Sequence, residues 1–234
     1  MFFIRIANYD FVIDNKYDYI YHLCKNYITH ATSGIEISVT HDEINREQTG
    51  EYKLDYLESL AIYRKIAEYL IDKGIVLFHG SAIAVDNEAY IFTAKSGTGK
   101  STHVKLWCEL FKDQACVIND DKPLLSVKEN SVIVHGTPWS GKHHLDSNIS
   151  VPLKAICILE RGISNRIERI NDKDAWPILM QQSYRPCNES SMEKTLSLID
   201  ILIKNTKFYK MYCNMDIQAA LMAYNCMGKK RGDK

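Results

Sequence analysis

The sequence predicts an α/β protein built around a central sheet. Short apolar runs that alternate like strands recur along the chain, and segments with apolar residues at helical spacing lie between them. Strands and helices interleaved in this way are typical of an α/β fold. At 234 residues the chain can bury roughly 70% of its unfolded surface, which is enough for one domain and a small appendage.

The first fifty residues predict a small α/β addition to that domain. Its expected elements are a strand over 2–13, a helix over 18–28 and a strand over 34–40. The polar stretch 41–52 is the best linker in the chain. We therefore expect the addition to cover residues 1–52 and the main domain to cover 53–234.

The main domain is expected to begin with a long helix over 54–74, which closes on the end signal Lys73-Gly74. Further helices are expected over 101–111, 175–183, 192–205 and 215–227. Strands are expected over 75–85, 89–94, 115–119, 131–136, 153–160 and 207–213.

Composition argues against several classes of partner. Lys plus Arg and Asp plus Glu number 29 each, so the zero net charge gives no support for a nucleic-acid or membrane partner. No apolar run approaches the roughly 20 residues that span a bilayer. The opening "MFFIRIANYDFVID" predicts a strand rather than a signal peptide, and the basic tail over 228–234 predicts a solvated terminus. Seven scattered cysteines without CxxC spacing indicate reduced thiols in a cytoplasmic protein.

The stretch "IFTAKSGTGKSTHVKLW", residues 91–107, predicts a phosphate-binding loop between a strand and a helix. Gly97 and Gly99 leave the backbone N–H groups open to phosphate, Lys100 supplies a cation, and Ser101 supplies a hydroxyl for Mg²⁺. Ala94 stands where the pattern has its first glycine, and alanine suits that position if φ stays negative. ATP with Mg²⁺ is the expected ligand. The nucleotide-binding residues are expected to be Ser96, Gly97, Thr98, Gly99, Lys100, Ser101 and Thr102.

A pair of carboxylates follows the next strand, in "CVINDDKPLL". Phosphoryl transfer needs a carboxylate for Mg²⁺ and commonly another that orients or deprotonates the acceptor. Asp120 and Asp121 fit these two duties, whereas an isolated pair would more often form a turn or a helix cap. The sequence does not say which of the two binds metal and which is the base.

The segments "FHGSAIAVDNEAYIFTAKSGTGKSTHVKLW" and "VINDDKP" resemble the catalytic core of bacterial HPr kinase/phosphorylase. His79-Gly80, the loop and the Asp pair match that family in order and spacing, and "SGTGK" is also similar to ATP-dependent phosphoenolpyruvate carboxykinase. The resemblance implies a P-loop kinase core. It also implies that Lys100 binds the β-phosphate, Ser101 the metal, and His79 assists near the acceptor.

Two later stretches, "HGTPWSGK" over 135–142 and "VPLKAICILERG" over 151–162, resemble HPr-kinase-related proteins of Firmicutes. Some of those relatives phosphorylate a serine on a ribosomally made peptide. The arginine-rich segment that HPr kinase uses around its protein substrate has no clear counterpart here, which argues against HPr as the acceptor. HPr kinases form hexamers, so the resemblance also allows a homo-oligomer.

These observations predict a Mg²⁺-dependent kinase that transfers the γ-phosphoryl group of ATP to a hydroxyl, most simply a serine of a protein or peptide. Lys142, Arg161 and Arg185 are the candidate cations on the substrate side, although Arg161 and Arg185 are also typical surface residues. One alternative is a small-metabolite kinase or carboxykinase-like enzyme, in which these three cations would converge in one cleft. Another is a nucleotide sensor without turnover.

Overall fold

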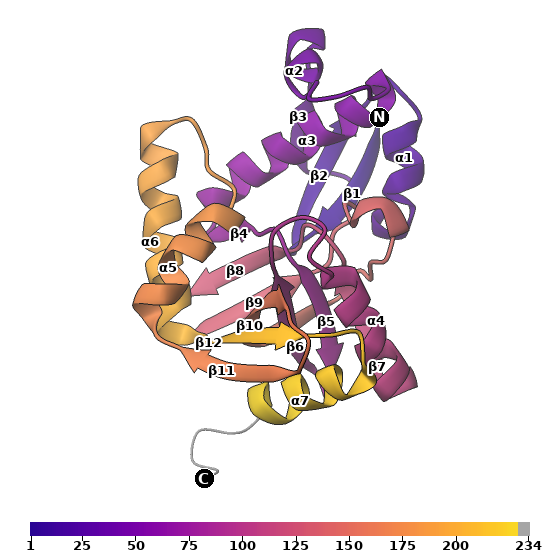
Figure 1. Cartoon of the computed structure of the whole chain (residues 1–234). Helices are drawn as coiled ribbons and strands as arrows, with labels where there is room; N and C mark the ends of the chain where they lie inside the picture. Colours follow the sequence, from indigo (N-terminus) through magenta and orange to yellow (C-terminus); the bar gives the residue numbers. More distant parts are fainter. Residues whose placement is uncertain (229–234) are drawn as a thin grey trace.

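In the computed structural model, which describes residues 1–228, the chain forms two sheets covered by helices (Figure 1). The smaller sheet has three strands and the larger has nine. This mixed architecture confirms the α/β class predicted from the sequence. Most of the basic tail, residues 229–234, lies outside the described residues.

The small sheet is built from β1 (Phe2–Ile6), β2 (Tyr9–Asp14) and β3 (Ile35–Ser38) in that spatial order. The single strand expected over 2–13 was wrong, because Ala7 and Asn8 have φ of 50° and 67° and turn the chain into a hairpin. The helix expected over 18–28 is shorter, with α1 at Tyr19–Leu23 followed by one 3₁₀ turn at Lys25–Tyr27.

The stretch 41–52, expected to be a linker, contains a helix, α2, at His41–Arg46. The Thr40 side chain accepts from the backbone N–H of Glu43, and the Glu43 carboxylate accepts from the backbone N–H of Thr40 at 2.7 Å. This reciprocal capping box starts the helix, and its T-x-x-E signature is present in the sequence. The long helix α3 follows at Leu54–Ile71.

The large sheet runs in the order β4-β8-β9-β10-β6-β5-β7, with β12 paired to β10 and β11 paired to β12. The strand expected over 75–85 is two strands, since Phe78, His79 and Gly80 separate β4 from β5 and the two pair with different neighbours. The strands are β4 (Ile75–Leu77), β5 (Ser81–Val85), β6 (Glu88–Thr93), β7 (Ala115–Asn119), β8 (Leu124–Lys128), β9 (Ser131–His135), β10 (Ser150–Arg161), β11 (Arg166–Ile170) and β12 (Lys207–Cys213). Of these, β8 and β11 were not expected from the sequence.

Helices cover both faces of this sheet. Neighbouring residues of β6 show the two faces, because Ile91 packs in a cluster with Leu202 of α6 (Glu189–Asn205) while Phe92 packs in another with Trp107 of α4 (Lys100–Phe111). Figure 1 shows α4 beside α7, and α5 beside α6. The helices are α4 (Lys100–Phe111), α5 (Asp172–Gln182), α6 (Glu189–Asn205) and α7 (Ile217–Met227).

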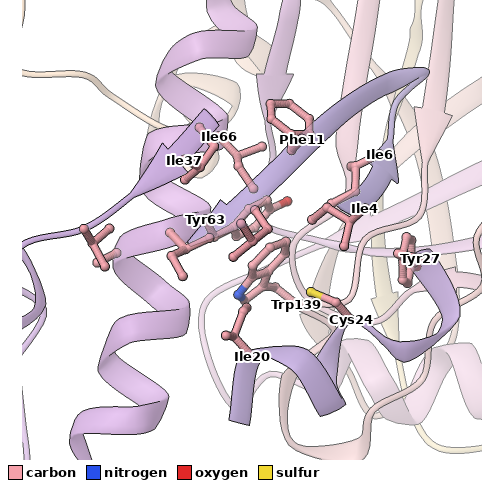
Figure 2. Packing of buried hydrophobic residues seen from close by; sticks show 14 of the residues in the cluster. Ile4, Ile6, Phe11, Ile20, Cys24, Tyr27, Ile37, Tyr63, Ile66 and Trp139 are labelled. Carbon is pink, nitrogen blue, oxygen red and sulfur yellow. The ribbon is translucent and has the colours of Figure 1, made fainter. Parts of the chain in front are cut away.

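A third hydrophobic cluster joins the small sheet to the rest of the chain (Figure 2). It combines Phe11 and Ile20 with residues of α3 such as Ile66, and with Trp139 from the loop after β9. Its members therefore come from both sides of residue 52. The domain boundary between residues 52 and 53 stays a prediction.

Candidate functional site

Three chain segments meet at one edge of the large sheet. Strand β5 lies between β6 and β7 and is antiparallel to both, so the start of β5 lies where β6 and β7 end. His79 precedes β5. The glycine loop, which we define as residues 94–101, follows β6, and Asp120-Asp121 follows β7. The topology alone thus gathers the predicted catalytic residues, although they are far apart in sequence.

The glycine loop has the backbone that its sequence requires. Gly97 and Gly99 have φ of 75° and 125°, values that residues with side chains rarely adopt. A Cβ placed on either glycine would meet no atom within 4 Å, so the space above the loop is open. Ala94 is buried and is not among the positive-φ residues, so alanine is accommodated at the position where the pattern has glycine.

Lys100 begins α4 and its side chain is folded into the loop. The residue is 9% exposed, and Nζ donates to the backbone oxygen of Ala94 at 3.1 Å. Burial lowers the pKa of Lys100, whereas the carboxylates of Asp121 and Asp120 act to raise it. The ammonium group is thus held between the loop and the carboxylate pair.

Asp120 is the more buried carboxylate of the pair. Its backbone is fixed on both sides, because the Ser81 hydroxyl donates to its carbonyl at 3.0 Å and its N–H donates to the Leu145 carbonyl at 3.1 Å. The side chain is 6% exposed, yet its Oδ1 atom is buried without a hydrogen-bond partner. An unsatisfied buried carboxylate oxygen is costly unless a cation or donor completes it.

This donor set fits Mg²⁺. The ion prefers oxygen ligands and is commonly held by one or two carboxylates together with substrate phosphates. Asp120, Asp121 and the Ser101 hydroxyl line the same cleft. Within residues 1–228 no group of three or more His, Cys, Asp or Glu side chains could form a metal cage. The residues present therefore fit a metal that shares its ligands with a bound phosphate.

Asp121 is surrounded by basic groups. Its Oδ1 lies 3.4 Å from Nε2 of His79, and its Oδ2 lies 3.7 Å from Nζ of Lys122. Burial would raise the pKa of Asp121, but the hydrogen bond with His79 and the charges of Lys122 and Lys100 hold this pKa below its usual range. The His79 ring is oriented from behind by Gln182, whose Oε1 lies 2.8 Å from Nδ1.

Asn119 is a supporting residue that sequence reasoning missed. It is fully buried at the end of β7, and its Oδ1 accepts from the backbone N–H groups of Asp121 at 2.8 Å and Lys122 at 2.6 Å. Its amide donates to the Thr137 carbonyl at 2.8 Å. Asn119 therefore ties the Asp turn to the loop after β9. The sequence signal that could have identified it is the position of an asparagine just before the Asp pair. Asn side chains commonly form hydrogen bonds with the backbone two residues further along the chain.

The loop after β9, residues 136–144, forms the other wall of the site. Gly141 has φ of 73°, and a Cβ there would lie 3.2 Å from Cβ of Asp121, so this loop packs directly on the carboxylate. Lys142 follows and lines the cleft. Trp139 of the same loop is 4% exposed and inserts into the hydrophobic cluster that joins the small sheet to the rest of the chain (Figure 2).

These segments enclose a cleft of about 660 Å³. It brings together nearly all residues that the sequence predicted for nucleotide, metal and catalysis, along with two tyrosines, Tyr52 and Tyr56, that the sequence did not indicate. The predicted residues that line it are His79, Ser96, Gly97, Gly99, Lys100, Ser101, Thr102, Asp120, Asp121 and Lys142.

Two of the predicted substrate-side cations lie elsewhere. Arg161 lines a second cavity, of about 510 Å³, with Thr98, and its Nη2 donates to the Gly97 carbonyl at 2.6 Å. It therefore contacts the glycine loop from the second cavity. Arg185 is exposed and lines neither this cavity nor the cleft. Among the three, Lys142 alone lines the cleft, and its role on the substrate side stays a prediction.

The fold and the cleft together define an α/β protein that places a glycine loop, a buried lysine and a carboxylate pair at one sheet edge. The family described as SynChlorMet cassette protein ScmC matches residues 44–226 of this chain, which is more than half of it. The chain belongs to this family.

Other comparisons add little. The Hpr(Ser) kinase/phosphatase from Coxiella burnetii is a structural neighbour at 10% identity, with 62% of this chain and 90% of that chain covered and a TM-score of 0.36. A superposition this loose defines no common fold. No curated protein matches the chain. Among residues 1–228, no helix is both long and apolar enough to cross a membrane.

Proposed function

We propose that this protein is a Mg²⁺-dependent phosphotransferase of the HPr serine kinase type, which transfers the γ-phosphoryl group of ATP to a serine hydroxyl of a protein or peptide. One observation supports this most strongly. The glycine loop with Lys100 and the pair Asp120-Asp121 line a single cleft, so phosphate-binding groups and carboxylates face the same space.

The triphosphate would lie on the glycine loop. Open backbone at Gly97 and Gly99 admits phosphate oxygens, and the N-terminus of α4 presents its free N–H groups and positive dipole to them. Lys100 supplies the cation for the β- and γ-phosphates. The second cavity shares Gly97, Gly99 and Thr102 with the cleft, so it is the natural place for the nucleoside.

The two carboxylates would divide their duties. Asp120, with its unpartnered buried oxygen, and the Ser101 hydroxyl would hold Mg²⁺, which supplies charge neutralisation for the phosphates when bound. Asp121 would accept the proton of the serine hydroxyl, because it lies at the open side of the pair and is oriented by His79. Its low pKa keeps it ionised at neutral pH.

The alternatives have less support. A small-metabolite kinase would call for a compact cationic pocket, and Lys142, Arg161 and Arg185 do not line one cleft. A sensor without turnover has no use for a carboxylate such as Asp121 that is oriented by His79 and faces the open cleft. The first observation favours a larger acceptor, and the second favours turnover.

The test is to incubate the purified protein with Mg·ATP labelled on the γ-phosphate, alone and with extract of the host cell, and to separate products by size. We expect the wild-type protein to transfer label to a protein or peptide, and the Lys100→Met variant to transfer none. Label on a small metabolite would replace the proposal with the metabolite kinase. If ATP binds but no label is transferred, the nucleotide sensor without turnover is the remaining interpretation.

A further inference from the structure

A third hollow, of about 340 Å³, which we call the side cavity, opens beside Asp121. It shares Tyr52, Tyr56, Asp121, Gly141 and Lys142 with the cleft, so the two spaces adjoin. The side cavity differs from the cleft in its chemistry, because its remaining walls include Tyr19, Leu23, Leu60, Pro138 and Trp139. Aromatic and aliphatic groups thus form much of the wall of a space that ends at the proposed base, with Lys122, Ser140 and His144 as further polar members.

The aromatic wall comes from the N-terminal part of the chain. Tyr19 of α1 meets Tyr56 of α3 edge to face, with ring centroids 6.1 Å apart. The ring centroids of Tyr52 and Tyr56 are 5.3 Å apart. Tyr52 is 51% exposed and stands at the rim. Large aromatic groups around a pocket expose apolar surface to water, and a ligand that covers this surface gains binding free energy.

The floor of the side cavity is rigid. The Trp139 ring stacks on Tyr63 and its Nε1 donates to the Ser59 carbonyl at 2.9 Å, while the Tyr63 hydroxyl donates to the Lys122 carbonyl at 2.6 Å. These bonds fix the loop 136–144 and the Asp turn against α3. A pocket with locked walls costs little to organise when a ligand binds.

We propose that the side cavity binds the large apolar side chain of a peptide residue next to the phosphorylated serine. A group seated there would hold its neighbouring hydroxyl at Asp121, because Asp121 lines both spaces. The volume of about 340 Å³ is enough for one large side chain, and the adjoining cleft would take the residue that carries the hydroxyl. This inference rests on the proposed function, since it names the acceptor of the same cleft.

Charge around the side cavity is compatible with this occupant. Lys122 and Lys142 stand at its border, and Asp121 is the only acid among the residues of the described chain that line it. A peptide that carries an aromatic or branched aliphatic residue, with or without a carboxylate, meets no repulsion beyond Asp121 itself. A serine flanked by small residues would leave the apolar walls in contact with water.

The test measures binding separately from transfer. Alanine-based peptides with one serine, and with Phe, Leu or Ala placed at each neighbouring position in turn, are titrated calorimetrically into the protein loaded with Mg²⁺ and a non-hydrolysable ATP analogue. At one position Phe and Leu should bind about tenfold to hundredfold more tightly than Ala. Tyr19→Ser and Leu23→Ala alter only the side of the cavity away from the glycine loop. Each should reduce the ratio of Phe-peptide or Leu-peptide affinity to Ala-peptide affinity by about threefold to tenfold, because apolar contact area is lost.

Tyr21→Ser is the matched control, because Tyr21 lies on the same helix as Tyr19 but does not line the side cavity. It should keep the full preference for Phe and Leu. Equal binding of the Phe, Leu and Ala peptides, or a preference that survives both cavity variants, would overturn the proposal. If the preference is present and depends on Tyr19 and Leu23 but no labelled phosphate moves, the side cavity stands and the kinase assignment fails.

Discussion

The indole ring of Trp139 stacks on the phenol ring of Tyr63 with centroids 4.0 Å apart and planes 1° apart. This contact connects the loop after β9, which carries Gly141 and Lys142, to helix α3 and the small sheet. Because Gly141 packs on Asp121, α3 supports the candidate site through this aromatic pair, together with the hydrogen bonds from Trp139 to Ser59 and from Tyr63 to Lys122.

Trp139→Ala should therefore destabilise the protein and loosen the site together. Loss of this buried ring should lower the free energy of unfolding by about 3–5 kcal/mol, measured by urea denaturation. Trp176→Ala is the control, since Trp176 is 40% exposed and should cost about 1 kcal/mol or less. If the two substitutions lower the free energy of unfolding equally, the stack of Trp139 on Tyr63 contributes no more to stability than an exposed tryptophan does.

Lys100→Met should separate stability from nucleotide binding. The ammonium group is buried with one hydrogen bond to the Ala94 carbonyl, so an apolar side chain of similar length should leave the free energy of unfolding unchanged or raise it by about 1 kcal/mol. The affinity for Mg·ATP should fall by about tenfold or more, because a charge-assisted contact to phosphate is lost. Retained affinity would exclude Lys100 from the nucleotide site.

Gly99→Ala and Gly97→Ala should weaken nucleotide binding through backbone strain alone. Neither new Cβ would clash, yet both φ values are unfavourable for alanine, and φ of 125° at Gly99 more so than 75° at Gly97. Both variants should bind Mg·ATP more weakly by a factor of about 5–100, with Gly99→Ala the more affected. Calorimetry with the nucleotide measures this, and a reversed order would mean that the loop rearranges on binding.

Acid should destabilise the fold at pH values well above those at which ordinary carboxylates titrate. Burial lowers the pKa of His135 and of His103 to about 4, whereas an unfolded histidine titrates near 6.5. The unfolded chain thus binds more protons between these values, so stability is fully present above about pH 6.5 and falls toward pH 4, by about 3 kcal/mol for each histidine.

His135→Gln tests that pH dependence, because glutamine keeps a polar group near Ser126 and Ser150 but does not titrate. The slope of the unfolding free energy against pH should become shallower between pH 6.5 and 4. His30→Gln, at an exposed position, should retain the wild-type slope. An unchanged slope in His135→Gln would assign the acid sensitivity to other groups.

Much of the site was readable from the sequence because its groups are local. The glycine loop joins a strand directly to a helix, and the Asp pair directly follows a strand, so each carries its signal within a few residues. The α/β class and the long helix α3 followed from strong periodicity in the same way.

The remaining features depend on contacts between distant residues. Tyr52, just before α3, and Tyr56, in its first turn, line the cleft only because α3 packs against the loop after β9 and the Asp turn. Arg161 contacts the glycine loop because β10 runs parallel to β6. A two-residue turn at Ala7-Asn8 does not interrupt an alternating pattern, so the first hairpin read as one strand. Trp139 gave no hint of its burial, since its partners Tyr63 and Ser59 are some eighty residues earlier.

The most direct test of the proposed chemistry is the rate of γ-phosphoryl transfer from labelled Mg·ATP to a serine-containing acceptor in Asp121→Asn, with Asp113→Asn as the exposed control. Asp121→Asn should slow transfer by about 10²–10⁴-fold while Mg·ATP still binds, and Asp113→Asn should be as fast as the wild type. Transfer at the wild-type rate in Asp121→Asn would contradict the assignment of Asp121 as the base and the account of the cleft that depends on it.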